Sequence, residues 1–134
     1  MNLADYFENH QGLGILATAD SDGTLDLAIY AKPQVVNENT VAFVMQEQLT
    51  HQNLMSSLHA AYMFVEQGEG YHGKRLYLTK IREETNASQV AEFVKKQPEI
   101  CSPDDDSNKY LTYFQIDNIW PLVGDKSIQQ DCSI

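Results

Sequence analysis

The sequence predicts a mostly β protein: a small antiparallel barrel with two or three short peripheral helices. About six segments have strand character, turn-like sequences separate several of them, and helical periodicity is confined to short stretches. Strands and helices do not alternate regularly, as they would around a parallel sheet. The length of 134 residues predicts one domain over residues 1–134, in which 124–134 form a loose polar tail.

The first third of the chain is predicted as one helix and three strands. Helical spacing of Leu3, Tyr6 and Phe7 predicts a short helix over residues 2–10. A strand begins at Leu13, and the turn at 20–23 ends in a glycine that can adopt positive φ.

Two further strands follow this turn. Alternation with a period of two predicts a strand over residues 25–36, with Asp26, Ala28, Tyr30 and Lys32 on one face. Residues 40–46 are apolar on both faces, which predicts a strand that is buried on both sides.

A change of period predicts a second helix over residues 50–59. Thr50 is a favoured N-cap residue, and Leu54 and Leu58 are four residues apart. Strand character returns over residues 60–65 and again over 75–81, after a glycine-containing loop.

The last third of the chain is predicted as a helix, a loop and a strand. The helix starts at Thr85 or Asn86 and has apolar residues at helical spacing, namely Ala87, Val90, Ala91 and Val94. A polar loop at 102–107 precedes the last strand, which alternates over residues 110–119.

Charge excludes two classes of partner. The chain has 19 acidic and 9 basic residues and a net charge of −10, which would repel phosphate backbones and anionic lipid. We therefore expect neither nucleic acid nor a membrane as partner. The first residues lack the pattern of a signal peptide and no stretch has the length of a transmembrane helix, so we expect a cytoplasmic protein.

Motifs for catalysis and metal binding are missing from the sequence. Cys101 and Cys132 have no CxxC spacing and are predicted to be free thiols, and the spacing of the four histidines matches no zinc motif. There is no GxSxG or P-loop pattern, so catalytic residues are not predicted. Redox chemistry would therefore need a bound cofactor.

Lys32 is the only Lys or Arg in the first 73 residues, and it lies in an apolar strand. A buried ammonium group needs an anion or a path to solvent. The first amides of a helix bind phosphate well, so Lys32 and the predicted helix start at Thr50 suggest one phosphate site. The alternatives are a surface lysine at a strand end and a plain helix cap.

Residues 69–75 are a second candidate. Two glycines flank Tyr71 and His72, and Lys74 and Arg75 follow. His72, Lys74 and Arg75 line the mouth of a site on one interpretation. On the other, this is a glycine-bearing hairpin with surface charges.

Several segments together resemble a known family. They are Gly14-Ile15-Leu16-Ala17-Thr18-Ala19, the turn Asp22-Gly23, the strands 25–32 and 40–45, and Thr50-His51-Gln52-Asn53-Leu54. In this order they resemble the split-barrel flavin-binding proteins related to pyridoxamine 5′-phosphate oxidase. The resemblance covers residues 1–82, and the last strand through Trp120 is compatible with it.

The resemblance implies a homodimer of six-stranded antiparallel split barrels that holds FMN at the subunit interface. By position, two groups of residues would border the flavin ring or ribityl chain, namely Ala28, Ile29, Tyr30 and Val44, Met45, Gln46. Lys32, Thr50 and Asn53 would serve the phosphate, and an aromatic side chain such as Tyr30 or Trp120 would cover the ring. The preferred function is an FMN-dependent oxidoreductase or electron-transfer protein with an unknown small-molecule substrate or redox partner.

The sequence departs from the family pattern in two places. A Lys or Arg that many members have at the start of the helix is replaced by Leu49-Thr50-His51, and the arginine-led C-terminal motif for the vitamin substrate is missing. We therefore do not expect a true pyridoxamine 5′-phosphate oxidase. One alternative is a non-catalytic haem- or flavin-binding sensor, motivated by His51 and His72. The other is a dimeric scaffold that has lost its site.

Overall fold

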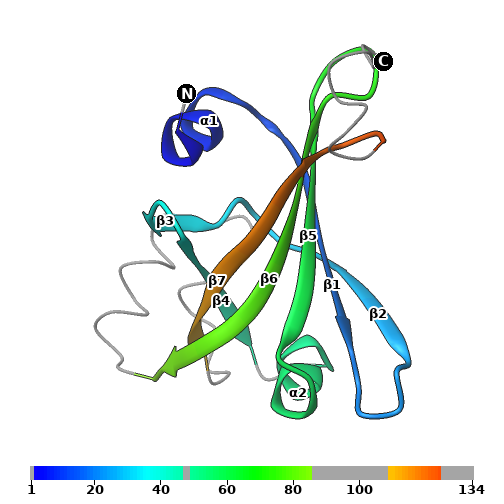
Figure 1. Cartoon of the computed structure of the whole chain (residues 1–134), viewed down its shortest axis with the longest axis vertical. Coiled ribbons are helices and arrows are strands. Elements are labelled where there is room, and N and C mark those ends of the chain that lie inside the picture. The colour runs from blue at the N-terminus through cyan, green and yellow to red at the C-terminus, as the bar shows by residue number, and fades with distance from the viewer. Residues whose placement is uncertain (1, 47–48, 86–108, 125–134) are drawn as a thin grey trace.

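The computed structural model describes residues 2–46, 49–85 and 109–124. Its seven strands form one antiparallel sheet in the order β2-β1-β5-β6-β7-β4-β3, with two helices beside it (Figure 1). The elements are α1 (Leu3–Asn9), β1 (Gly12–Ala19), β2 (Leu25–Ile29), β3 (Gln34–Asn37), β4 (Thr40–Gln46), α2 (Leu49–Ser56), β5 (His59–Glu66), β6 (Gly73–Glu84) and β7 (Lys109–Pro121).

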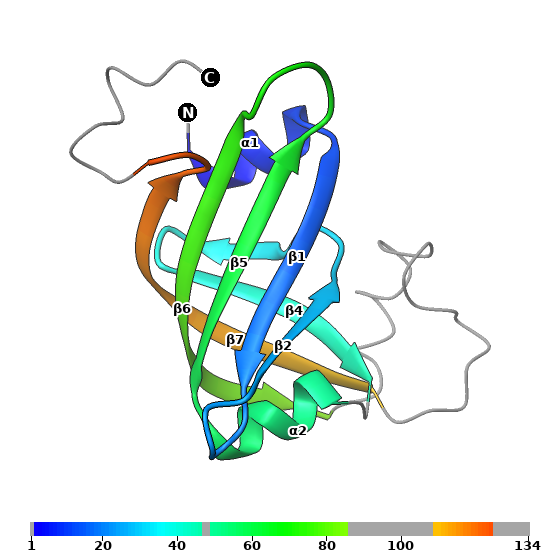
Figure 2. The ribbon, with the colours of Figure 1, turned by 90° about the vertical axis from the view of Figure 1, so that its right-hand side faces the viewer.

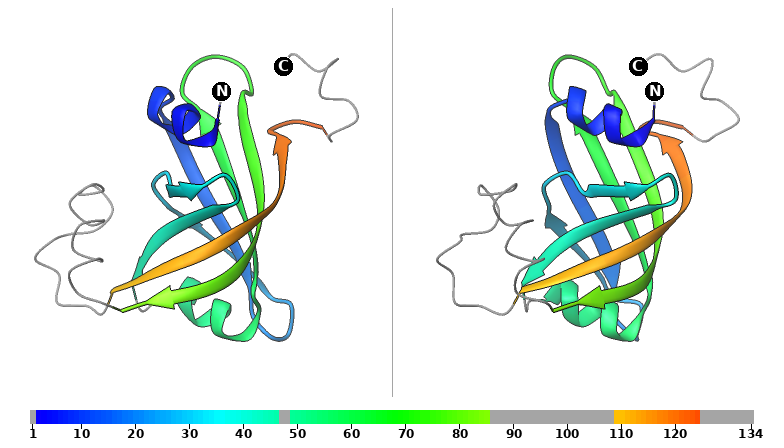
Figure 3. Two further views of the ribbon diagram at one scale, coloured as in Figure 1. Left: turned by 60° about the vertical axis from the view of Figure 1, so that its left-hand side comes forward. Right: turned by 90° about the vertical axis from the view of Figure 1, so that its left-hand side faces the viewer.

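The sheet curls on itself but stays open, which makes the barrel a split one. Strands β4 and β7 cross over β1 and β5 (Figure 3), and β2 and β3 are the two ends of the hydrogen-bonded order. The predicted mostly β, split-barrel fold is confirmed. The strand count was one too low because residues 25–36, predicted as one strand, form β2 and β3.

Residues 30–33 separate β2 from β3. Pro33 has no N–H to donate to a ladder, and its ring restricts the residue before it, so a continuous strand through this position is disfavoured. The separation lets the chain leave one end of the sheet at β2 and re-enter at the other end as β3.

The two helices lie at opposite ends of the barrel (Figures 1 and 2). The side chain of Asn2 caps α1 by accepting from the Asp5 N–H at 2.8 Å, and Tyr6 and Phe7 are buried. Helix α2 begins at Leu49, one residue before the predicted start, and ends at Ser56. Thr50 is thus inside the helix and not its N-cap, and Leu58 is exposed beyond its end.

The core fills the inside of the curled sheet. Its largest side chains are aromatic and pack edge to face, as Phe43 does against Phe114 at 5.8 Å and Phe7 against Phe64 at 5.3 Å between ring centroids. Strand β4 is buried on both faces, as predicted, because Val41, Phe43 and Met45 join this core while Ala42 and Val44 join a second cluster with Leu111 and Tyr113.

The remaining strand predictions differ from the structure only at their ends. Strands β5, β6 and β7 extend the predicted segments 60–65, 75–81 and 110–119 at one or both ends. The helix predicted from Thr85 or Asn86, the loop at 102–107, both cysteines and residues 125–134 of the predicted tail lie outside the described residues.

Candidate functional site

The outer face of the sheet carries large apolar side chains that nothing in the described part of the chain covers. On β2, Leu25, Leu27 and Ile29 are 77%, 71% and 63% exposed. They alternate with inward-facing Asp26 and Ala28, as a strand requires. Three such residues on one short strand form a contiguous patch of the kind that marks a binding surface.

Strand register extends this patch across the sheet. Residues paired across antiparallel strands point to the same face. One row therefore crosses five strands, and it consists of Ile29, Ile15, Met63, Arg75 and Trp120. The next row consists of Leu27, Ala17, Ala61, Tyr77 and Asn118.

We call these two rows the open face. It spans four strand spacings, about 19 Å at ~4.8 Å each. Ala17 and Ala61 have small side chains, so the middle of the second row is a shallow depression between larger side chains. A planar apolar group or another apolar surface would fit on this face.

Trp120 and Arg75 close one end of the open face. The Arg75 guanidinium lies 5.4 Å from the centroid of the Trp120 ring, and the Tyr77 ring is 5.2 Å from it at an interplanar angle of 64°. Arg75 Nε donates to the Pro121 carbonyl at 2.8 Å. Two aromatic rings and a fixed cation are therefore held together at the end of an apolar row.

The residues predicted to border a flavin do not all lie on one face of the sheet. Ile29 is on the open face, whereas Ala28 pairs with core residue Leu16 and faces inward. Tyr30 packs against Phe43 of β4 at 5.9 Å between ring centroids, so the chain just after β2 approaches β4 at this point.

On β4, the side chains of Val44 and Met45 are 3% and 1% exposed. Only their backbone can border a ligand. Strand β3 pairs with residues 40–42 of β4. On that same edge of β4, residues 43–46 have no strand partner within the described residues, so the backbone of Gln46 lies on a free edge. Cofactor contact by all six of these residues stays a prediction.

The structure does not bring Lys32 and Thr50, the residues of the predicted joint phosphate site, together within one chain. The Lys32 ammonium donates to the carbonyls of Phe7 and His10, at 2.7 and 2.9 Å. These carbonyls are at the C-terminal end of α1, which attracts cations. Thr50 lies in α2, at the other end of the barrel (Figures 1 and 2). The role of each residue alone toward a phosphate stays a prediction.

Thr50 and Asn53 are also engaged inside the protein. Both are 4% exposed. The Thr50 hydroxyl donates to Asp26 at 3.4 Å, and the Asn53 amide donates to the Thr18 hydroxyl at 3.1 Å. These bonds attach α2 to β1 and β2.

The two histidines that motivated a haem site lie at opposite ends of the barrel. His51 is buried in α2 and bonded to Glu83 at 2.5 Å, whereas His72 is exposed in the loop before β6. Lys74 and Arg75 do not line one mouth together, because successive strand residues face opposite sides. Lys74 lies over the Tyr6 ring at 4.7 Å, and Arg75 is on the open face.

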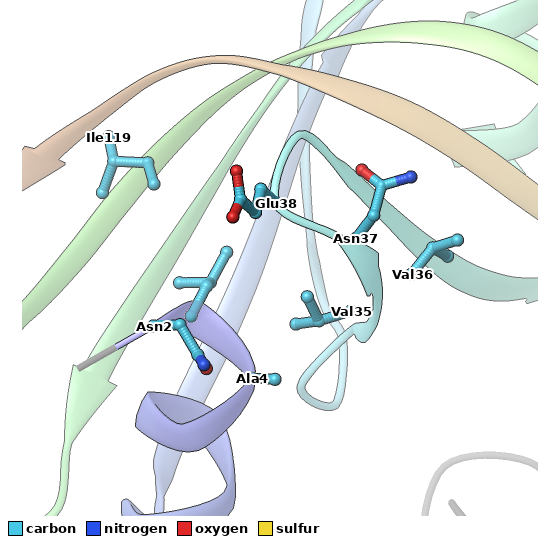
Figure 4. Close-up of a pocket in the computed structure, with 8 residues that line it drawn as sticks. Asn2, Ala4, Val35, Val36, Asn37, Glu38 and Ile119 are labelled. Atoms are coloured by element: carbon cyan, nitrogen blue, oxygen red, sulfur yellow. The ribbon is translucent and has the colours of Figure 1, made fainter.

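A separate cavity of about 540 Å³ lies between α1, β3 and β7 (Figure 4). Its lining is mainly apolar and includes Leu3, Val35 and Ile119, and Glu38 is the one charged side chain among the described residues that line it. A carboxylate without a cation would repel a phosphate. This cavity therefore does not suit the phosphate of a nucleotide cofactor.

The described residues contain no cluster of three or more His, Cys, Asp or Glu side chains that could hold a metal ion. Nor does any helix among them have the length and apolar character to cross a membrane.

Sequence reasoning missed Ile15, Met63 and Tyr77. Each sits in a strand whose alternate residues are in the core, and β1 and β5 are apolar on both faces. That two-sided pattern was visible in the sequence. Which outward residues lie side by side depends on strand register, which no local pattern reveals.

The fold defines the class of protein as a split β-barrel with an open apolar sheet face. No family model matches the chain, and no curated protein matches it. Solved structures do share the fold. An FMN-binding protein from Syntrophomonas wolfei subsp. wolfei has a TM-score of 0.73 at 15% identity, over 90% of this chain and 84% of that chain.

Two other solved structures are similar. A protein from Lactobacillus delbrueckii assigned as a pyridoxamine 5′-phosphate oxidase has a TM-score of 0.62 at 15% identity, over 87% of this chain and 88% of its own. The haem storage protein HutZ from Vibrio cholerae has a TM-score of 0.61 at 14% identity, over 90% of this chain and 95% of its own. The chain has the split-barrel fold of the pyridoxamine 5′-phosphate oxidase-like proteins.

Proposed function

We propose that the protein is an FMN-binding flavoprotein that works as a homodimer, as an oxidoreductase or electron-transfer protein. The observation that carries the proposal is the open face, an apolar surface that ends in the Arg75, Tyr77 and Trp120 cluster. The similarity of the fold to an FMN-binding protein supports flavin over other planar ligands.

The exposure of β2 supports the proposed homodimer. Leu25, Leu27 and Ile29 would each be mostly withdrawn from water against a second apolar surface, which is worth about 1.5–3 kcal/mol for a fully buried side chain. A second copy supplies such a surface, because a two-fold interface brings the same patch from both subunits together.

The open face offers an apolar surface for a flavin ring, but the structure has no cation that is ready to bind the flavin phosphate among the residues predicted for that role. Ile29 from one subunit and Trp120 from the other would contact the ring, because about 19 Å separates the two residues within one subunit. The backbone edges after β2 and along β4 could bond its polar rim. A bound flavin supplies hydride or single-electron transfer. Lys32 would have to exchange its bonds with the Phe7 and His10 carbonyls to reach a phosphate. We therefore expect weaker binding than at a preformed phosphate site.

A visible spectrum tests the proposal. Purified protein is incubated with FMN, desalted, and measured for flavin absorbance and for molar mass by light scattering. We expect one FMN per subunit and the mass of a dimer. A protein that elutes without flavin absorbance at any FMN concentration would contradict flavin binding, and a monomer mass would contradict the interface.

Haem binding is the second candidate. One observation favours it: His72 and Tyr71, which are exposed next to each other in the loop before β6 and are groups that can coordinate haem iron. The shared fold with a haem storage protein agrees with it. Haem titration should then give a Soret band that His72→Ala shifts or removes. An unchanged band in that variant would exclude His72 as ligand.

A further inference from the structure

We propose that Arg75 is the positioning residue that fixes Trp120 on the open face and thereby shapes one end of the cofactor site. The effect on a cofactor rests on the proposed function. The effect on Trp120 does not, and it can be measured in the protein alone.

Arg75 is placed for this role by strand register. It is the direct partner of Trp120 across β6 and β7, so both side chains stand on the same face. The guanidinium lies 5.4 Å from the centroid of the indole, close enough for a cation–π contact. Arg75 therefore limits where the Trp120 ring can lie.

The guanidinium also holds the backbone that follows Trp120. Nε donates to the Pro121 carbonyl at 2.8 Å, and Nη2 donates to the Gly124 carbonyl. Gly124 has φ of +83°, a left-handed conformation that glycine adopts without strain and that turns the chain there. Arg75 thus ties both ends of a four-residue segment, 121–124, directly after the indole.

Tyr77 contacts both Arg75 and Trp120. Its hydroxyl accepts from Arg75 Nη1 at 3.4 Å, and its ring meets Trp120 edge to face at 5.2 Å. The Arg75 side chain therefore contacts one indole ring, one phenol hydroxyl and two carbonyls. Lysine could not replace it, because an ammonium group is a point charge without the planar fork that reaches several acceptors.

A fixed Trp120 matters because of its place in the row. A planar ring lying over Ile29, Ile15 and Met63 would meet Arg75 next along the row, with the indole of Trp120 directly beyond it. If the indole is already held, ligand binding does not have to restrict it. Loss of Arg75 should then weaken binding both by freeing the indole and by removing the guanidinium from the row.

The chain has one tryptophan, so its fluorescence reports on Trp120 alone. In Arg75→Met without ligand, we expect lower steady-state anisotropy and an emission maximum at longer wavelength. Arg75→Lys should change both in the same direction. FMN affinity should fall about five- to tenfold in each variant, as expected for loss of preorganisation.

Arg82→Met is the matched control. Arg82 is on the same strand and lies over the Tyr113 ring at 3.7 Å, outside the open face. The Arg82→Met substitution removes the same charge as Arg75→Met and should leave the anisotropy and emission of Trp120 unchanged. Far-UV circular dichroism and thermal melting show whether each variant folds, and Arg75→Lys serves if Arg75→Met does not.

Two results would overturn the inference: unchanged Trp120 anisotropy in a folded Arg75 variant, or an equal change in Arg82→Met. Full recovery in Arg75→Lys would overturn the role of the guanidinium fork. A wild-type protein that binds no FMN would contradict the proposed function alone, since the anisotropy without ligand still decides the role of Arg75.

Discussion

His51 Nε2 lies 2.5 Å from Glu83 Oε1 and joins α2 to β6 across one end of the barrel. The imidazole is almost completely buried and stacks on the Tyr110 ring at 3.9 Å with an interplanar angle of 15°. Lys80 Nζ is 3.6 Å from the same carboxylate oxygen. These contacts make His51 a structural residue of α2.

We expect His51→Ala to destabilise the protein by about 2 kcal/mol, because it leaves the Glu83 carboxylate without its shortest hydrogen bond and removes a stacked ring. Urea unfolding followed by circular dichroism measures this. His72→Ala, at an exposed histidine, is the control and should change stability by less than about 0.5 kcal/mol. Equal effects of the two substitutions would show that the pair with Glu83 contributes nothing.

Thr112→Val should leave stability unchanged or raise it by up to about 1 kcal/mol. The Thr112 hydroxyl is fully buried and has no hydrogen-bond partner among the described residues, and valine has nearly the same shape. Removing an unsatisfied polar group therefore costs no interaction. The same unfolding experiment measures the effect. A loss of more than about 1 kcal/mol would mean that the hydroxyl is bonded in solution.

Gly14→Ala should destabilise the protein by about 3 kcal/mol or prevent folding. A Cβ at this position would be 2.0 Å from the Tyr62 hydroxyl and 2.4 Å from the Tyr30 carbonyl oxygen. Thermal melting compares it with Gly23→Ala, which has open space and a φ of +85° and should cost about 1 kcal/mol. Adding Tyr62→Phe should recover part of the loss at residue 14. No recovery would assign the clash to the Tyr30 carbonyl oxygen and to the ring carbon Cζ of residue 62, which phenylalanine keeps and which would lie 2.6 Å from the Cβ.

Alkaline pH should weaken the fold. Burial, together with the bond to Glu66 at 2.5 Å, raises the pKa of Tyr6 well above its ordinary value, and burial does the same to the pKa of Tyr62. Because the folded state holds these protons more tightly, their contribution is complete below about pH 10 and is lost as the pH rises above it. The free energy of unfolding should therefore decline as the pH is raised from about 8 to about 11, a range that brackets the ordinary tyrosine pKa of about 10. In Tyr6→Phe the decline should be shallower, and an identical slope would contradict this origin.

Charges on the open face should separate the proposed dimer. We expect Leu27→Asp combined with Ile29→Asp to give a monomer by light scattering, since the two carboxylates would lose hydration in the interface. Val36→Asp, on the other end strand of the sheet, is the control and should leave the dimer intact. A double variant that keeps the wild-type mass would place the interface elsewhere.

The pattern of apolar, polar and turn residues in the sequence determined those features that depend on residues close together in the chain. Two-sided apolar character predicted the buried strand β4, and the Asp-Gly turn predicted the hairpin that Gly23 closes at positive φ. Alternation also separated the two faces of β2 correctly, with Leu25 and Leu27 opposite Asp26 and Ala28.

Partners far apart in the chain were decided only by the tertiary structure. Lys32 was identified as unusual from sequence, but its acceptors are carbonyls at the end of α1, 22 and 25 residues away, and not a phosphate shared with Thr50. The row from Ile29 to Trp120 depends on the register of four strand pairs. Periodicity assigns a residue to a face, whereas register and the path of the chain decide which residues meet on it.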